Sequence, residues 1–174
     1  MTIAIRPARG PDVPAINSLL RASVATDDEA GLVRDLCIAG DMVLMMVAAD
    51  DGGAIVGTVA FSRMEVRVAG QPVPAVALAP LAVAFAHRRE GVAEALVQAG
   101  LDRLEEEGVV LCFVLGAPAF YTRFGFDAAY ARGFDSPYAG DHLMALPIQG
   151  GLMPCGVREA AAHAAPFARL GAGR

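Results

Sequence analysis

An apolar, strand-forming run passes through a short polar turn directly into a helical pattern over residues 76–107. Valine, alanine and leucine dominate residues 76–86, and the turn reads HRREG over residues 87–91. The helical stripe consists of apolar residues three or four positions apart: Val92, Ala93, Leu96, Val97, Leu101 and Leu104. Unpaired N–H groups and the positive end of the helix dipole meet at such a turn. With two adjacent arginines, it is predicted to attract phosphate.

Three phosphate-binding motifs can be compared with this turn. A nucleotide-hydrolase loop needs a Lys-Ser/Thr pair after its second glycine, and a dinucleotide fingerprint needs three spaced glycines. The turn has only Gly91, so what remains is the pattern Arg/Gln-x-x-Gly-x-Gly/Ala over residues 88–93. Taken alone, the pattern also fits arginines that are simply solvated at a helix start. Both interpretations stay open on these six residues.

The rest of the chain predicts alternating strands and helices. Strands are predicted over residues 2–6, 42–49, 54–68, 73–86, 109–115 and 142–148, and helices over residues 13–24, 27–40 and 92–107, with a short one after Pro118. Pro80 lies inside the fourth strand and has no N–H to donate, so pairing must be interrupted there. This proline indicates either an edge or bulge, or an opening built into the sheet.

Composition excludes several classes of function. The chain has 174 residues, which suits one domain, and a net charge of −5, which gives no general attraction for nucleic acid. The three cysteines and three histidines are scattered, so neither a disulfide framework nor a metal site is expected. The longest apolar run holds two prolines and is too short for a membrane span. The start, MTIAIRPARG, lacks the order of a secretion signal, so we expect a cytoplasmic protein, and the 55% hydrophobic content suggests a homodimer.

Two motifs at a fixed separation carry a resemblance to a known family. Pro80-Leu81-Ala82-Val83 precedes the turn, and Phe120-Tyr121-Thr122-Arg123-Phe124-Gly125-Phe126 follows the next apolar strand. Over residues 2–148 the chain resembles the GNAT superfamily of acyl-CoA-dependent N-acetyltransferases, and most closely a bacterial subgroup with these motifs. The resemblance implies an α/β (α+β) fold with a mostly antiparallel sheet that splays between its fourth and fifth strands. One catalytic domain is expected over residues 1–150.

An alanine-rich tail is expected over residues 151–174. Residues 157–165 are predicted to be helical before Pro166, in a loosely docked end.

The resemblance also implies where acetyl-CoA binds. The pantetheine arm would pair with the backbone of Leu81, Ala82 and Val83. The pyrophosphate would lie on the amides of five consecutive residues: Arg89, Glu90, Gly91, Val92 and Ala93. Arg88 and Arg89 would add positive charge, whereas the carboxylate of Glu90 is tolerable only if it points to solvent. Phe120 and Arg123 would border acetyl-CoA, although either side chain is equally suited to packing.

Family members transfer the acetyl group directly from acetyl-CoA to an amine. The residue that matches the family's usual acid is Tyr121, whose phenol is protonated at neutral pH; the alternative is a tyrosine that only fills the edge of the core. The fourth strand has no carboxylate, so the base is unassigned between the remote Glu65 and a chain of waters. We therefore expect an N-acetyltransferase that acts on an amine of a small molecule or peptide. The alternative, favoured by Glu90 and the missing base, is an acyl-CoA-binding sensor without turnover.

Overall fold

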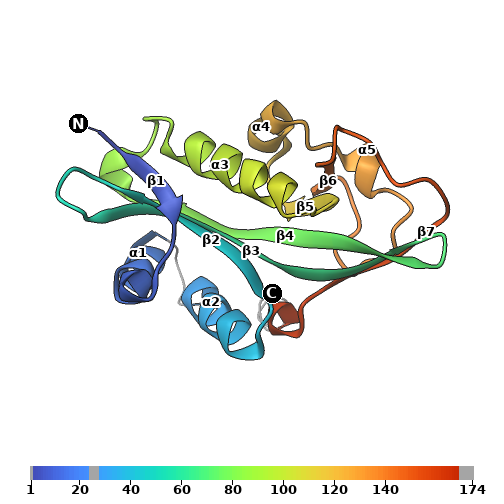
Figure 1. Cartoon of the computed structure of the whole chain (residues 1–174), viewed down its shortest axis with the longest axis horizontal. Coiled ribbons are helices and arrows are strands. Elements are labelled where there is room, and N and C mark those ends of the chain that lie inside the picture. Colours follow the sequence, from blue (N-terminus) through green and yellow to red (C-terminus); the bar gives the residue numbers. More distant parts are fainter. Residues whose placement is uncertain (1, 24–27, 169–174) are drawn as a thin grey trace. The chain divides into compact units, whose positions relative to one another are not determined.

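The computed structural model describes residues 2–23 and 28–168 (Figure 1). Val24 and Asp27, at the ends of two predicted helices, lie outside the described residues. The strands are β1 (Ala4–Pro7), β2 (Met42–Ala49), β3 (Ile55–Val68), β4 (Gln71–Val83), β5 (Leu111–Leu115), β6 (Leu143–Pro147) and β7 (Arg158–His163). The α-helices are α1 (Val13–Ser23), α2 (Asp28–Ala39), α3 (Val92–Glu106), α4 (Pro118–Tyr121) and α5 (Ala128–Ala131). Single turns of 3-10 helix are η1 (Gly10–Asp12), η2 (Phe85–His87), η3 (Thr122–Phe124) and η4 (Ala165–Phe167).

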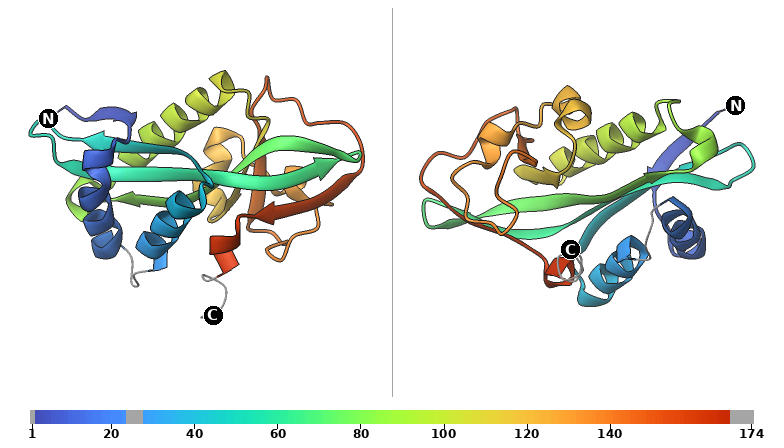
Figure 2. Two further views of the ribbon diagram at one scale, coloured as in Figure 1. Left: turned by 60° about the horizontal axis from the view of Figure 1, so that its bottom comes forward. Right: turned by 180° about the vertical axis from the view of Figure 1, so that it is seen from behind.

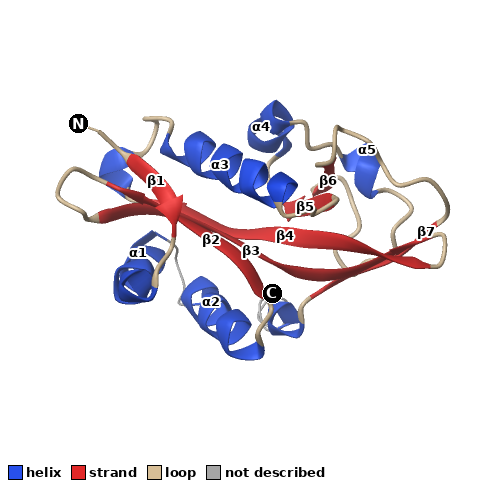
Figure 3. Ribbon diagram, viewed as in Figure 1, coloured by secondary structure: helices blue, strands red, loops and turns tan. Residues whose placement is uncertain are grey.

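The described strands form one mixed sheet in the order β1-β2-β3-β4-β5-β6, with β7 paired to β3. The pairs β1–β2, β5–β6 and β3–β7 are antiparallel, whereas β4 and β5 run parallel. Strands and flanking helices are distinguished by colour in Figure 3. This arrangement confirms the predicted fold class, and the parallel pair β4–β5 joins the fourth and fifth strands, where the splay is expected.

The described residues divide into two compact units, which we treat separately. The first comprises Met1–Phe61, Ala79–Asp102 and Ala165–Arg174. In this unit α1 and α2 lie on one face of the strands and the start of α3 on the other (Figures 1 and 2). The α1–α2 face is held by buried apolar side chains from two helices and two strands: Ile16, Leu20, Ala30, Val33, Val47 and Ala82. These contacts anchor the end of β4 on the helical layer.

On its other face, β3 comes unusually close to α3. A Cβ on Gly100 of α3 would lie 2.4 Å from Cε2 of the Phe61 ring, and one on Gly57 of β3 would lie 2.9 Å from Cδ1 of Leu96. Because glycine has no side chain, helix and strand pack at this short distance. The close contact fixes the start of α3, and therefore the turn before it, on the sheet.

The second unit comprises Ser62–Leu78 and Arg103–Ala164. Its strand β5 is buried over Leu111–Val114 and pairs with β6 from Leu111↔Pro147 to Leu115↔Leu143. The buried Phe113 ring meets Phe134 edge-to-face, with ring centroids 5.4 Å apart. This core carries α4 and η3, the short helices that hold the second sequence motif.

Two local predictions were wrong. Residues 158–163, predicted as part of a helix, form β7, whose residues 161–163 pair with Met64–Val66 of β3. Backbone pairing and the burial of Ala161 outweigh the helical preference of an alanine-rich segment. Residues 85–87, of which the first two were predicted to belong to the fourth strand, form η2 instead. Within the described ranges, no helix combines the length and apolar character needed to cross a bilayer.

Candidate active site

The turn between β4 and α3 has a backbone shape that suits an anion. Arg89 has a φ of 65° and Gly91 a φ of 81°, so left-handed conformations occur at two positions of the turn. Glycine adopts this conformation without strain, whereas arginine does so at a cost. Left-handed residues next to ordinary ones turn successive N–H groups toward one side and create a concave anion site.

The N–H groups of this turn lie at the start of α3, where a helix leaves its first N–H groups without partners inside the helix. The first backbone bond of α3 runs from the N–H of Ala95 to the carbonyl of Gly91, at 3.0 Å. For residues 89–93, no backbone acceptor of their N–H groups is found among the described residues. Five consecutive donors are therefore available at the positive end of a 15-residue helix.

Arg88 is held in place by the residues before it. Its Nε donates to the carbonyl of Val83 at 3.2 Å, and its guanidinium carbon lies 5.5 Å from the centroid of the Phe85 ring. Phe85 is 84% exposed, so this ring covers no core and instead serves as a platform for the arginine. The charge of Arg88 is thereby fixed beside the turn.

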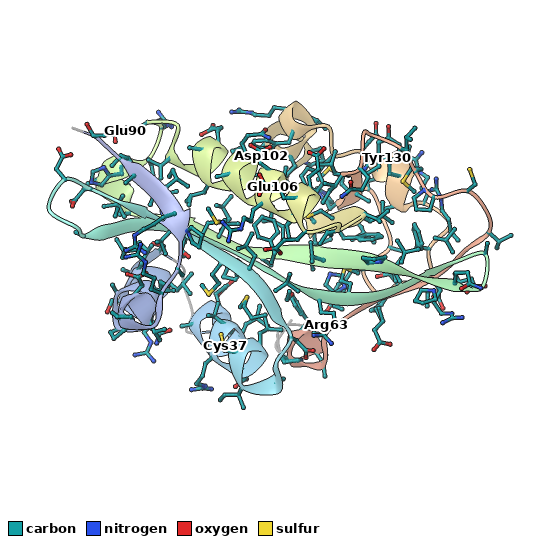
Figure 4. The ribbon with its side chains drawn as sticks, viewed as in Figure 1. Cys37, Arg63, Glu90, Asp102, Glu106 and Tyr130 are labelled. Carbon is teal, nitrogen blue, oxygen red and sulfur yellow. The ribbon has the colours of Figure 1, made fainter. Side chains whose placement is uncertain are left out.

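Glu90 turns its charge toward a histidine. Its Oε2 lies 3.2 Å from Nδ1 of His87, and 53% of the Glu90 side chain is exposed. Figure 4 shows Glu90 at the N-terminal end of α3. The sequence alone indicated that the Glu90 carboxylate must point to solvent. The carboxylate meets this condition, because it is half exposed and contacts His87. His87 was not identified as a site residue, although its spacing of three residues from Glu90 is a signal for such a pair.

The last residues of β4 offer backbone without a partner on β5. The parallel pairing joins Ala75–Leu78 to Leu111–Val114, and β4 then continues to Val83. Leu81 and Val83 are half-buried, whereas Ala82 packs into the core against α1 and α2. Pro80 is buried and follows the last paired residue by two positions. Its position favours the interpretation of an opening over that of a bulge.

In the second unit, Tyr121 stands in an aromatic group. Its ring contacts Phe120 and Phe126 edge-to-face, with centroid distances of 4.9 Å and 5.8 Å. A Cβ on Gly116 would lie 2.6 Å from Cε2 of Tyr121, so the absence of a side chain at Gly116 makes room for the phenol ring. Gly116 was not identified from the sequence as a residue that shapes the site.

The phenol of Tyr121 holds its proton tightly. Burial raises the pKa of Tyr121 to about 12, and the nearby Cys112 thiol adds a smaller effect in the same direction. Burial also raises the pKa of Cys112, which is fully enclosed in β5. Both groups are therefore neutral at physiological pH, and the tyrosine is a proton donor with a fixed ring.

The structure places the other residues predicted from the sequence as follows. In the second unit, the guanidinium carbon of Arg123 lies 5.2 Å from the centroid of the Phe120 ring, so these two are brought together. Glu65, the remote candidate base, is exposed on β3, where its register partner is Ala162 of β7. Among residues 2–23 and 28–168, no group of three or more His, Cys, Asp or Glu side chains is arranged to bind a metal ion.

Comparisons with known proteins identify the family. The family model described as an acetyltransferase (GNAT) domain matches residues 4–129. Over 118 residues the chain is 47% identical to the uncharacterized N-acetyltransferase YhbS of Escherichia coli K12, covering 68% of this chain and 70% of that protein.

Solved structures agree with this assignment. The E. coli YhbS structure in complex with CoA superposes with a TM-score of 0.84 and 36% identity, covering 96% of this chain and 92% of that one. A GNAT family acetyltransferase from Brucella melitensis in complex with acetyl-CoA gives a TM-score of 0.77 and 29% identity, covering 95% and 98%. With its family model, its YhbS-like sequence and its mixed sheet in agreement, this chain belongs to the GNAT acetyltransferase family.

Proposed function

We propose that this enzyme transfers the acetyl group of acetyl-CoA to a primary amine of a small molecule or peptide. The observation that carries the proposal is the run of N–H groups over residues 89–93 at the start of α3, for which no backbone acceptor is found in the described part of the chain, with Arg88 and Arg89 beside it. Such a run suits the oxygens of a pyrophosphate. The complexes of E. coli YhbS with CoA and of the Brucella protein with acetyl-CoA support the choice of ligand.

The remaining predicted residues have assigned duties in this proposal. Leu81, Ala82 and Val83 would pair through their backbone with the pantetheine arm, because β4 continues beyond its pairing with β5. Arg88 and Arg89 would neutralise phosphate charge. We assign Phe120 and Arg123 to the border of the acetyl-CoA site, since their cation–π contact fixes both side chains together.

Tyr121 is the proposed general acid. The amine nitrogen attacks the carbonyl carbon of the thioester, so a C–N bond forms and a tetrahedral intermediate results. When the intermediate collapses, the C–S bond breaks and the sulfur leaves with the electron pair. The Tyr121 hydroxyl then gives its proton to the sulfur. The amine nitrogen loses one proton to a base or to solvent, and solvent restores the phenol. A phenol that is neutral at every physiological pH suits this duty.

Binding without turnover is the less favoured candidate. It was favoured by the negative charge of Glu90 within the turn and by the missing base on the fourth strand. The Glu90 carboxylate is paired with His87 and exposed, which removes the first of these two supports. Loss of the phenol would have supported it too, but Tyr121 is present in a fixed position.

A panel of amines tests the proposed function. The protein and acetyl-CoA are incubated with one class of amine at a time: amino acids, polyamines, aminoglycosides or peptides with free N-termini. Release of the CoA thiol is followed, and the acetylated product is checked by mass spectrometry. We expect release that depends on one class of amine. If acetyl-CoA binds in calorimetry but no amine causes thiol release, the transferase assignment to amines is wrong and the sensor is favoured.

A further inference from the structure

His142 and Tyr121 lie against the same glycine. The last register pair of β5 and β6 joins Leu115 to Leu143, so Gly116 and His142 come next on the two strands. The N–H of Gly116 donates to the carbonyl of His142 at 3.1 Å, and Nδ1 of His142 lies 3.3 Å from the carbonyl oxygen of Gly116. Gly116 is also the residue whose missing side chain accommodates the Tyr121 ring. The phenol ring of Tyr121 and the imidazole of His142 therefore both contact Gly116.

The contact with Gly116 fixes the tautomer of His142. A carbonyl oxygen can only accept a hydrogen bond, so Nδ1 must carry the hydrogen that it shares with Gly116. In the neutral imidazole the lone pair is then on Nε2, which is the atom available to take a proton. His142 is exposed, so its side chain is accessible from solvent.

Three other titratable groups of the second unit are less suited to the role of a base. Cys112 is buried, and burial raises the pKa of its thiol, so it stays protonated. His163 packs edge-to-face on Tyr138, with ring centroids 4.9 Å apart, and is partly buried on β7. Glu65 lies on β3, where it pairs with β7. Within the described second unit, His142 alone combines exposure, a fixed tautomer and contact with the residue that holds Tyr121.

We propose that His142 is the general base of the acetyl transfer and takes the proton from the acceptor amine on Nε2. The inference rests on the proposed function, which needs a proton acceptor for the amine as well as a donor for the sulfur. As the C–N bond forms, one N–H proton of the amine passes to Nε2, directly or through one water. The phenol protonates the sulfur as the C–S bond breaks. Solvent then removes the proton from the imidazolium and returns one to the phenolate, which leaves amide and CoA thiol as products.

A pair of substitutions separates this role from a structural one. His142→Asn keeps a side-chain N–H near the position of Nδ1, so the contact with Gly116 can persist while the base is lost. His142→Ala removes both. General bases contribute roughly a hundredfold or more to rate, so we expect kcat to fall by about that factor in both variants. Acetyl-CoA affinity and the thermal midpoint should stay at wild-type values for His142→Asn.

Added imidazole supplies the decisive measurement. We expect it to restore turnover of His142→Ala in a saturable manner, after subtraction of the reaction without enzyme, with the same amide as product. A kcat for His142→Asn within twofold of the wild-type value would overturn the base assignment and leave the transferase intact. A wild-type protein that binds acetyl-CoA and turns over no amine would instead overturn the proposed function, and the base with it.

Discussion

At the scale of single residues, Tyr121 carries the sharpest prediction. Replacing it with phenylalanine removes only the hydroxyl, and the ring contacts with Phe120 and Phe126 are expected to persist. If the hydroxyl protonates the sulfur, kcat falls by roughly a hundredfold while the acetyl-CoA dissociation constant changes little. Steady-state kinetics and calorimetry check both parts. Tyr130→Phe on α5 is the matched control, labelled in Figure 4, and should leave kcat unchanged.

The raised pKa of the Tyr121 phenol also determines how stability and kcat depend on pH. Its pKa in the native protein is about 12, above the value near 10 of an unfolded chain. The native state therefore favours the neutral phenol, and this contribution to stability is complete below pH 10 and lost as the pH rises through 12. We expect no falling limb in kcat from Tyr121 below about pH 11. A fall in kcat near pH 9 in the wild type that is absent from Tyr121→Phe would contradict the burial of the phenol.

At the scale of elements, the turn before α3 combines charge with backbone strain. A non-glycine residue in the left-handed region costs on the order of 1 kcal/mol, and Arg89 is such a residue. Arg89→Gly should therefore raise the free energy of unfolding by up to about 1 kcal/mol while it weakens acetyl-CoA binding. Urea unfolding and calorimetry measure the two effects. When Arg89→Gly is combined with Arg88→Ala, we expect the affinity for acetyl-CoA to fall at least tenfold, because each charged hydrogen bond contributes about 1.5–3 kcal/mol.

A control and a contrary outcome define this test. Arg34→Ala removes an exposed arginine from α2, where it pairs with Asp35, and should not change acetyl-CoA affinity. If the Arg88→Ala, Arg89→Gly variant binds acetyl-CoA as tightly as the wild type, these arginines belong to a solvated surface and the cradle assignment is wrong.

We expect alanine substitutions at two helical glycines to have opposite effects on stability. A Cβ on Gly31 of α2 would have only Nη2 of Arg34 near it, at 3.9 Å, whereas a Cβ on Gly100 would meet the Phe61 ring at 2.4 Å. Alanine at Gly31 should raise the free energy of unfolding by about 1 kcal/mol through helix preference. Alanine at Gly100 should lower it by about 1–3 kcal/mol, because the Phe61 ring must move. Urea midpoints compare the pair, and equal shifts would contradict the close packing.

Sequence patterns predicted the elements that local periodicity defines. The strand, turn and helix around Arg88 and the apolar β5 follow from side-chain spacing and a helix start. Pairing between distant segments has no local signal, so β7 was predicted as a helix from its alanines. The contact of Gly116 with His142 depends on the β5–β6 register, which a periodic pattern does not define. The base could therefore not be assigned before the register was known.

At the scale of the whole molecule, three elements run through both compact units. β3, β4 and α3 each cross a boundary, at Phe61, Leu78 and Asp102 respectively. An element that continues across a boundary must unfold on both sides or break in its middle. We therefore expect a single cooperative transition for the chain.

The placement of the tyrosines makes this expectation measurable. All three tyrosines, Tyr121, Tyr130 and Tyr138, belong to the second unit, and the chain has no tryptophan. The proposed cradle, at residues 88–93, belongs to the first unit, as do α1 and α2. Intrinsic fluorescence thus follows one unit, whereas helical circular dichroism mainly follows the other.

Acetyl-CoA at a hundred times its dissociation constant should stabilise the native state by about 2.7 kcal/mol. For a chain of this size the thermal midpoint then rises by roughly 5–10 °C. If unfolding is cooperative, tyrosine fluorescence and circular dichroism show the same rise. A rise seen only by circular dichroism would mean that the first unit binds and unfolds independently. In the Arg88→Ala, Arg89→Gly variant both rises should shrink together, because weaker binding stabilises the native state less and a cooperative chain unfolds in one transition.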